Sequence, residues 1–139
     1  MFKLDTVLQR DCFVLGHFDL CQLLLMNDKN YPWFILVPRI NHIQELFQLS
    51  DNDQQQLIGE SSSFSKTIHR LFAADKLNIA ALGNVVPQLH IHHIVRYKKD
   101  PAWPAPVWGT VPAAPYEEDE KRQLITKLKP HLTENFSWL

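Results

Sequence analysis

Short apolar runs separated by turn-forming residues make up the N-terminal part of the chain. Residues 12–15, 20–26 and 33–37 are rich in branched and aromatic side chains, which is typical of strands. Gly16 and His17 separate the first two runs, and glycine readily adopts the conformations of a turn. A polar loop separates the second run from the third. Because short connections favour hairpin pairing over parallel crossovers, we expect these strands to pair antiparallel.

The period of the apolar residues becomes helical after residue 43. A short segment at 43–49 fits a helix, and a longer one follows Ser50 and Asp51. Apolar side chains of the longer segment recur at spacings of three and four along one stripe: Leu57, Phe64, Ile68, Leu71 and Phe72. We therefore predict that this segment is the main helix.

Two further helices are expected towards the ends of the chain. Residues 4–10 fit a short helical turn that Asp5 or Thr6 can cap. Residues 116–131 form a charged amphipathic segment that opens with acids, as the helix dipole favours. Between the main helix and the C-terminal helix, residues 76–82 fit a strand. A turn that contains Gly83 follows this strand.

A polar stripe interrupts the last apolar run, residues 88–96. Side chains alternate between the faces of a strand, so Gln88, His90 and His92 are expected to share one face, while His93 lies on the other with apolar neighbours. Burying such groups side by side costs free energy unless each finds a partner. We therefore expect these side chains to serve a function.

Three chemistries fit two histidines at this spacing. The pair can ligate a metal, can combine a nucleophile with a general acid or base, or can consist of satisfied polar residues on a half-exposed sheet. Metal binding needs a third ligand, and Cys12, Cys21 and His17 lie on other predicted elements without ligand spacing. We therefore expect no metal site.

The length and the net charge of the chain limit the kinds of function that we expect. The chain has 139 residues, which predicts a single domain over 1–139 with a core of its own. Its 14 Lys and Arg nearly balance 15 Asp and Glu, and no long basic run occurs. Binding to nucleic acid through phosphate neutralisation is therefore not expected.

The N-terminus and the cysteines bear on location. The N-terminus lacks a continuous apolar stretch, and no apolar span of about 18 residues occurs, so we expect no membrane segment. Cys12 and Cys21 look like small buried hydrophobes in a reducing compartment, although a bridge between adjacent strands also fits the sequence. The expected location is the cytoplasm.

Residues 100–115 are rich in proline and tryptophan, which precludes regular structure. Two exposed tryptophans would promote aggregation, so we expect an ordered aromatic loop that lies over the body of the protein. Trp103 and Trp108 then form a wall of a substrate pocket, a dimer contact, or the packing of the loop itself.

The histidine run and its surroundings resemble the histidine triad (HIT) family of nucleotide hydrolases and transferases. The family motif is His-φ-His-φ-His-φ-φ, where φ is apolar. Aligning its second and third histidines with His90 and His92 places Arg96 at the common basic position after the motif, and Gln88 replaces the first histidine. In the alternative register His90 and His92 are the first and second, and Ile94 takes the third place.

The resemblance covers residues 15–109, including an apolar strand that ends in Pro38 and Arg39. Trp33 stands where many members carry an additional active-site histidine, and His93 occupies a usually apolar position. The resemblance implies an α+β fold with an antiparallel sheet of about five strands, a long central helix and a C-terminal helix. It also implies a homodimer that acts on nucleotides without a cofactor.

The implied mechanism begins when neutral His90 attacks the α-phosphorus of a nucleotide derivative, giving a covalent nucleotidyl-histidine that water then hydrolyses. His92 holds a non-bridging phosphate oxygen or shuttles a proton. Gln88 can donate and accept hydrogen bonds but cannot release a proton at neutral pH. We therefore expect a preference for good leaving groups, such as phosphate chains, over amines.

Other residues take roles by the same resemblance. Asn27 falls where the family holds the ribose hydroxyls, although a plain turn role fits it equally, and Asn84 falls near an amide that contacts phosphate. Because His93 lies on the apolar face, we expect it to be either a structural histidine bonded to a carbonyl group or an interface residue. Because Gln88 and Trp33 replace two histidines, a degenerate domain that binds nucleotides without turnover is the alternative function.

Overall fold

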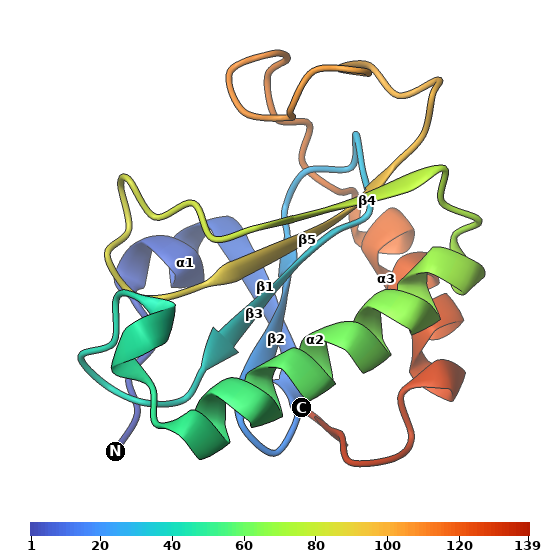
Figure 1. The fold of residues 1–139 in the computed structure, drawn as a ribbon. Helices are drawn as coiled ribbons and strands as arrows, with labels where there is room; N and C mark the ends of the chain where they lie inside the picture. Colours follow the sequence, from blue (N-terminus) through green and yellow to red (C-terminus); the bar gives the residue numbers. More distant parts are fainter.

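The computed structural model, which describes residues 1–139, is built on one sheet of six strands (Figure 1). All neighbouring strands pair antiparallel, in the order β4-β5-β3-β2-β1-β6. Their bounds are β1 Cys12–His17, β2 Cys21–Met26, β3 Trp33–Pro38, β4 Lys76–Ala80, β5 Ile91–Arg96 and β6 Ser137–Trp138. The predicted α+β class is confirmed.

The sixth strand, β6, comes from the C-terminal end of the chain and was not predicted. Gly16 pairs with Trp138, and His17 pairs with Ser137. A Cβ atom at Gly16 would collide with the backbone carbonyl of Ser137, so only glycine allows this close approach. Gly16 therefore continues β1 through a bulge, where the sequence suggested a turn.

Three α-helices accompany the sheet: α1 Thr6–Asp11, α2 Asp51–Leu71 and α3 Glu118–Leu128. The Asp5 carboxylate caps α1 by accepting the Val7 N–H, and the Ser50 hydroxyl caps α2 in the same way. The helix expected at 43–49 is only the 3₁₀ turn Leu46–Gln48. The C-terminal helix is shorter than 116–131, because it changes to a second 3₁₀ turn, Lys129–His131, around a proline.

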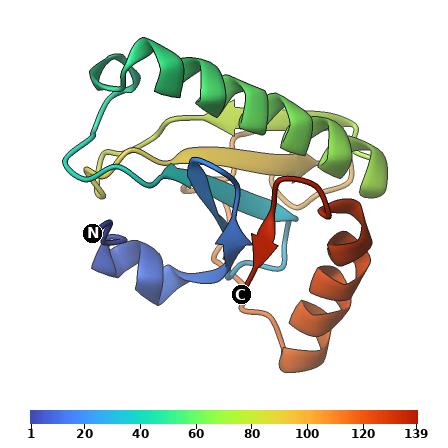
Figure 2. The same ribbon diagram turned by 90° about the horizontal axis from the view of Figure 1, so that it is seen from below.

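Both faces of the sheet are covered (Figure 2). Helix α2 lies along one face, while α1 and the loop of residues 100–115 lie on the other. Side chains of the central strand β3 alternate between the two cores: Phe34 and Leu36 face α2, and Trp33, Ile35 and Val37 face α1. This two-sided burial explains why β3 reads as a continuous apolar run.

The proline-rich loop is ordered and is held by Arg96 at the end of β5. The Arg96 guanidinium donates to both carboxylate oxygens of Asp100, at 2.8 and 3.0 Å, and also to the carbonyl of Ala105. It lies over the rings of Tyr31 and Trp103. The expectation of an aromatic loop packed on the body is therefore correct, and Arg96 is the residue that fixes it.

The two cysteines are free and buried. Burial raises the pKa of the Cys12 thiol to about 12 and also raises the pKa of the Cys21 thiol. They behave as small core residues and do not form the bridge that the sequence left open. None of the helices is long and apolar enough to cross a bilayer.

We expect Asp100→Ala to lower the free energy of unfolding by about 3–5 kcal/mol, because it leaves the buried Arg96 charge without its partner. Urea denaturation measures this loss. The matched control is Arg122→Ala, which breaks the exposed pair with Asp119 and should cost less than about 1 kcal/mol. Equal losses in the two variants would contradict the anchoring role of Arg96.

Candidate active site

The polar stripe of the histidine segment has two members, where the sequence predicted three. Strand β5 begins at Ile91, so Gln88 lies in a bend before the strand. The Gln88 amide oxygen accepts the Asp5 N–H at 2.9 Å, and its amide nitrogen donates to the Lys3 carbonyl at 3.0 Å. These two hydrogen bonds to the backbone of the N-terminal segment hold the Gln88 side chain away from the face that His90 and His92 share. The prediction that Gln88 belongs to the strand was therefore wrong.

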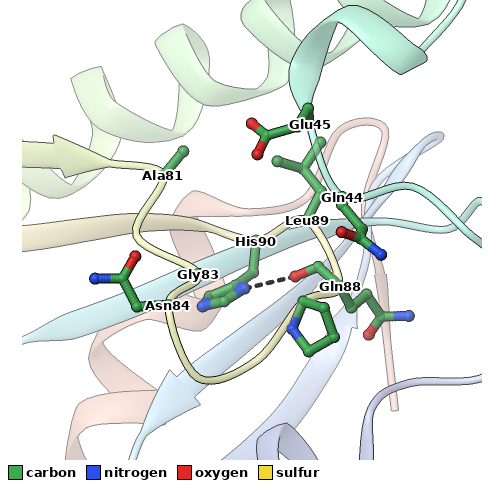
Figure 3. A pocket seen from close by; sticks show the side chains of 9 residues that line it. Gln44, Glu45, Ala81, Gly83, Asn84, Gln88, Leu89 and His90 are labelled. Atoms are coloured by element: carbon green, nitrogen blue, oxygen red, sulfur yellow. Dashed lines mark hydrogen bonds between the residues drawn. The ribbon is translucent and has the colours of Figure 1, made fainter.

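His90 precedes β5 by one residue, yet its ring lies against that of His92. The two ring centroids are 4.9 Å apart, and both side chains are buried. The Nδ1–H of His90 donates to the backbone carbonyl of Gln88 at 2.7 Å (Figure 3). A neutral ring protonated on Nδ1 carries its lone pair on Nε2, so this nitrogen is available as a nucleophile.

His92 points to the same side of the sheet as Trp33. The Trp33 indole N–H donates to His92 Nδ1 at 3.0 Å. Burial, followed by the neighbouring His90, lowers the pKa of His92 to about 4, and a hydrogen bond to the backbone of Leu82 opposes this shift. His92 is therefore a neutral ring at physiological pH.

His93 faces the opposite side, towards α2. Its Nδ1–H donates to the Ile91 carbonyl at 3.0 Å, which leaves Nε2 to accept the Ser61 hydroxyl at 2.7 Å. The side chain is fully buried, and burial lowers its pKa to about 4. Both nitrogens are occupied, so the structure supports the structural role that we expected.

Two cavities meet at His90. The first, the apolar cleft, has a volume of about 300 Å³ and also reaches His92 and Asn84. Its apolar lining comes from α1, from β2, from the loop before β5 and from the proline-rich loop: Val7, Leu8, Met26, Val85, Val86 and Trp108. A flat, partly apolar group such as a nucleobase fits such a lining.

The second cavity, the polar pocket, has a volume of about 170 Å³ and is also lined by His90 (Figure 3). Gln44 and Glu45 approach it from the segment after β3, while Gly83, Asn84 and Gln88 belong to the loop before β5. This pocket can take a hydrophilic group next to the His90 ring.

The two asparagines singled out from the sequence lie in different places. Asn84 lines both cavities, close to His90. Asn27 does not line either of them, although its neighbour Met26 does. The Asn27 side-chain oxygen accepts the Tyr116 N–H at 2.8 Å and so holds the segment before α3. A ribose contact by Asn27 stays a prediction.

Sequence reasoning missed most of the apolar cleft. Val7, Leu8, Arg10 and Asp11 come from α1, to which the sequence assigned no role. Nothing in their pattern distinguishes them from an ordinary short helix. Trp108 could be connected with a pocket from the sequence, because an ordered tryptophan in a proline-rich loop is expected to pack against another part of the protein. Its ring lies 5.0 Å from that of His92.

Metal ligation would need a third group beside the histidine pair. No set of three or more His, Cys, Asp or Glu side chains is arranged to hold an ion. The ring of His92 packs against the indole rings of Trp33 and Trp108, and neither side chain can ligate a metal.

Comparison with known protein families gives a match between residues 7–99 and the HIT domain. The chain belongs to the histidine triad family. A crystal structure of a histidine triad protein from Marinobacter aquaeolei VT8 is 51% identical over 97% of this chain and 98% of that chain, with a TM-score of 0.94. No curated protein sequence matches the chain significantly.

Two further HIT structures support the assignment. The protein from Sinorhizobium meliloti 1021 is 43% identical and that from Bradyrhizobium japonicum is 39% identical, and both have a TM-score of 0.92. Each match covers 95% of this chain and 98% of the other. The resemblance inferred from the histidine segment is therefore confirmed at the level of the family.

The buried neutral histidines predict a fall in stability in acid. The pKa values of His92 and His93 are lowered to about 4, below the ordinary value of 6.5 that the rings regain on unfolding. Between these values the unfolded chain binds protons that the folded chain excludes. Each ring then lowers the free energy of unfolding by up to about 1.4 kcal/mol per pH unit, and the stability is fully present above about pH 6.5.

Urea denaturation of the wild type and of His93→Leu between pH 7 and pH 4.5 tests this. We expect a smaller slope against pH in the variant, whatever its stability at pH 7. His69→Leu, which removes an exposed histidine of α2, should keep the wild-type slope. An unchanged slope in His93→Leu would contradict the buried neutral state of His93.

Proposed function

We propose that the protein is a nucleotide hydrolase or nucleotidyltransferase that cleaves at the α-phosphate through a covalent intermediate on His90. Membership of the HIT family supports the general class. One observation carries the finer proposal: the Nδ1–H of His90 is held by the Gln88 carbonyl, so its Nε2 presents a lone pair where two cavities meet.

In the first step the His90 Nε2 lone pair attacks the α-phosphorus, and the bond to the leaving group breaks with its electron pair on that group. The Gln88 carbonyl stabilises the positive charge that the ring acquires. In the second step water attacks the phosphorus and releases a proton to the solvent. The P–N bond breaks with its electron pair on Nε2, and the nucleoside monophosphate leaves. Neutral His90 is regenerated.

The surroundings suggest how the substrate lies. The apolar cleft takes the nucleoside, with the base against Trp108, and the polar pocket takes a hydrophilic group beside His90. Asn84, which lines both cavities, donates to the phosphate. His92, whose ring lies beside that of His90 in the apolar cleft, contacts a phosphate oxygen.

Two further proposals concern the whole molecule. Strand β4 is an edge of the sheet with Ile79 about half exposed, so a second copy of the chain can cover it, and we propose a homodimer. The free thiols of Cys12 and Cys21 fit a reducing compartment, and we propose a cytoplasmic location.

The covalent step is tested with an adenosine monophosphate p-nitrophenyl ester, alkaline quenching at short times and mass measurement of the intact protein. We expect a mass increase of one adenylate in the wild type. His90→Ala should lack it and lose turnover by about 10³-fold or more. His69→Ala, an exposed histidine on α2, is the matched control and should retain both.

Turnover without an adduct and without loss in His90→Ala would remove His90 from the nucleophilic role. Binding of the ester without turnover by the wild type would favour the degenerate binding domain.

A second test concerns the leaving group. Because Gln88 cannot release a proton, we expect ester and anhydride substrates with good leaving groups to react faster than phosphoramidates with amine leaving groups. Gln88 lines the polar pocket beside His90, so Gln88→His places a ring that can act as an acid at this pocket. We expect the variant to raise the rate with amines by up to about 10²-fold. A variant that folds normally and shows no gain would contradict this explanation of the preference.

A further inference from the structure

Trp33 contacts the second histidine of the site through the one polar atom that it possesses. Its indole N–H lies 3.0 Å from His92 Nδ1, and both side chains are more than nine-tenths buried. An indole N–H only donates, so His92 Nδ1 must be the acceptor and carries no proton. The proton of the neutral His92 ring is then on Nε2.

The sheet register fixes this contact. Trp33 pairs with Ile94 and Ile35 pairs with His92, so Trp33 and His92 are diagonal neighbours on one face of β3 and β5. The indole is further held by the rings of Tyr31 and Trp108, at 6.3 and 5.7 Å. Because these rings pack against the indole, they hold it in the orientation in which its N–H points to His92.

We propose that Trp33 is a positioning residue that locks His92 as the Nε2–H tautomer and prevents it from shuttling protons. This Nε2–H faces the Leu82 backbone in the free protein and donates to a phosphate oxygen when substrate is bound. This proposal rests on the function proposed above. A shuttle through imidazole needs one nitrogen to release a proton while the other takes one up. At His92 the second nitrogen faces an indole that neither releases nor accepts protons at any relevant pH. The proton for the leaving group therefore comes from another source, such as water.

The electrostatic surroundings agree with this assignment. The titratable and charged groups around the His92 ring are His90 beside it, His93 on the opposite face of β5, and Arg10 and Asp11 at the α1 side of the apolar cleft. No carboxylate contacts the ring to favour a second proton. Burial and then the neighbouring His90 lower the pKa of His92 and so favour the neutral form, against the opposing hydrogen bond to the Leu82 backbone. The indole N–H requires in addition that Nδ1 carries no proton.

Nitrogen-15 NMR of protein labelled at histidine tests the tautomer without any substrate, with the His92 signals assigned by their loss in His92→Gln. In the wild type we expect an unprotonated Nδ1 and a protonated Nε2 that persist down to about pH 5. In Trp33→Phe, which keeps an aromatic ring but lacks the N–H, we expect mixed tautomers and a His92 pKa higher by about one unit or more.

Trp108→Phe is the matched control. It makes the same chemical change next to the same ring, where the contact to His92 is aromatic packing at 5.0 Å. The His92 tautomer should remain as in the wild type. Formation of the adduct on His90 should slow by about 10-fold or more in Trp33→Phe, since partners that orient a functional histidine typically contribute this much.

A protonated Nδ1 on wild-type His92, or an unchanged His92 tautomer and pKa in folded Trp33→Phe, would overturn the proposal. The wild-type spectrum decides the first point even where the variant fails to fold. A fixed tautomer without any adduct on wild-type His90 would instead contradict the proposed function and leave the role of Trp33 on His92 intact.

Discussion

A buried imidazole must satisfy both of its ring nitrogens, and this requirement organises the segment at the start of β5. Three histidines lie there within four residues, and each meets it differently. His93 has both nitrogens bonded, to Ile91 and Ser61, and is closed to chemistry. His90 has only Nδ1 hydrogen-bonded within the chain, and its Nε2 is left for a group that binds in the cavities. His92 accepts at one nitrogen and donates at the other. The hydrogen-bond partners of the three histidines therefore decide which role each ring can have.

These partners depend on strand register. Because side chains alternate along β3 and β5, a slip of one residue would turn Trp33 towards α2 and remove it from His92. The two-sided burial of the sheet excludes such a slip, since it would exchange the apolar sets of both cores. Packing of ordinary hydrophobic residues thus fixes a hydrogen bond of 3.0 Å in the site.

The sequence predicted the features that local pattern controls. Alternation correctly separated His92 from His93, and the spacing of apolar residues located α2. It failed for Gln88, whose orientation depends on backbone groups of Lys3 and Asp5 more than 80 residues away in the chain. The α1 wall of the apolar cleft was missed for the same reason. A short capped helix has no local mark that shows what its side chains will face once the chain is folded.

One strand links the stability of the protein to its proposed chemistry. Along β5, His92 contacts the site, and Arg96 four residues later holds the loop through Asp100. That loop brings Trp108 against the ring of His92, where it forms part of the lining of the apolar cleft. A buried, fixed N–H donor interacts more strongly with phosphate charge than the same group does in bulk water. The buried ion pair therefore supports the proposed chemistry indirectly, because it keeps the aromatic wall in place around the histidines.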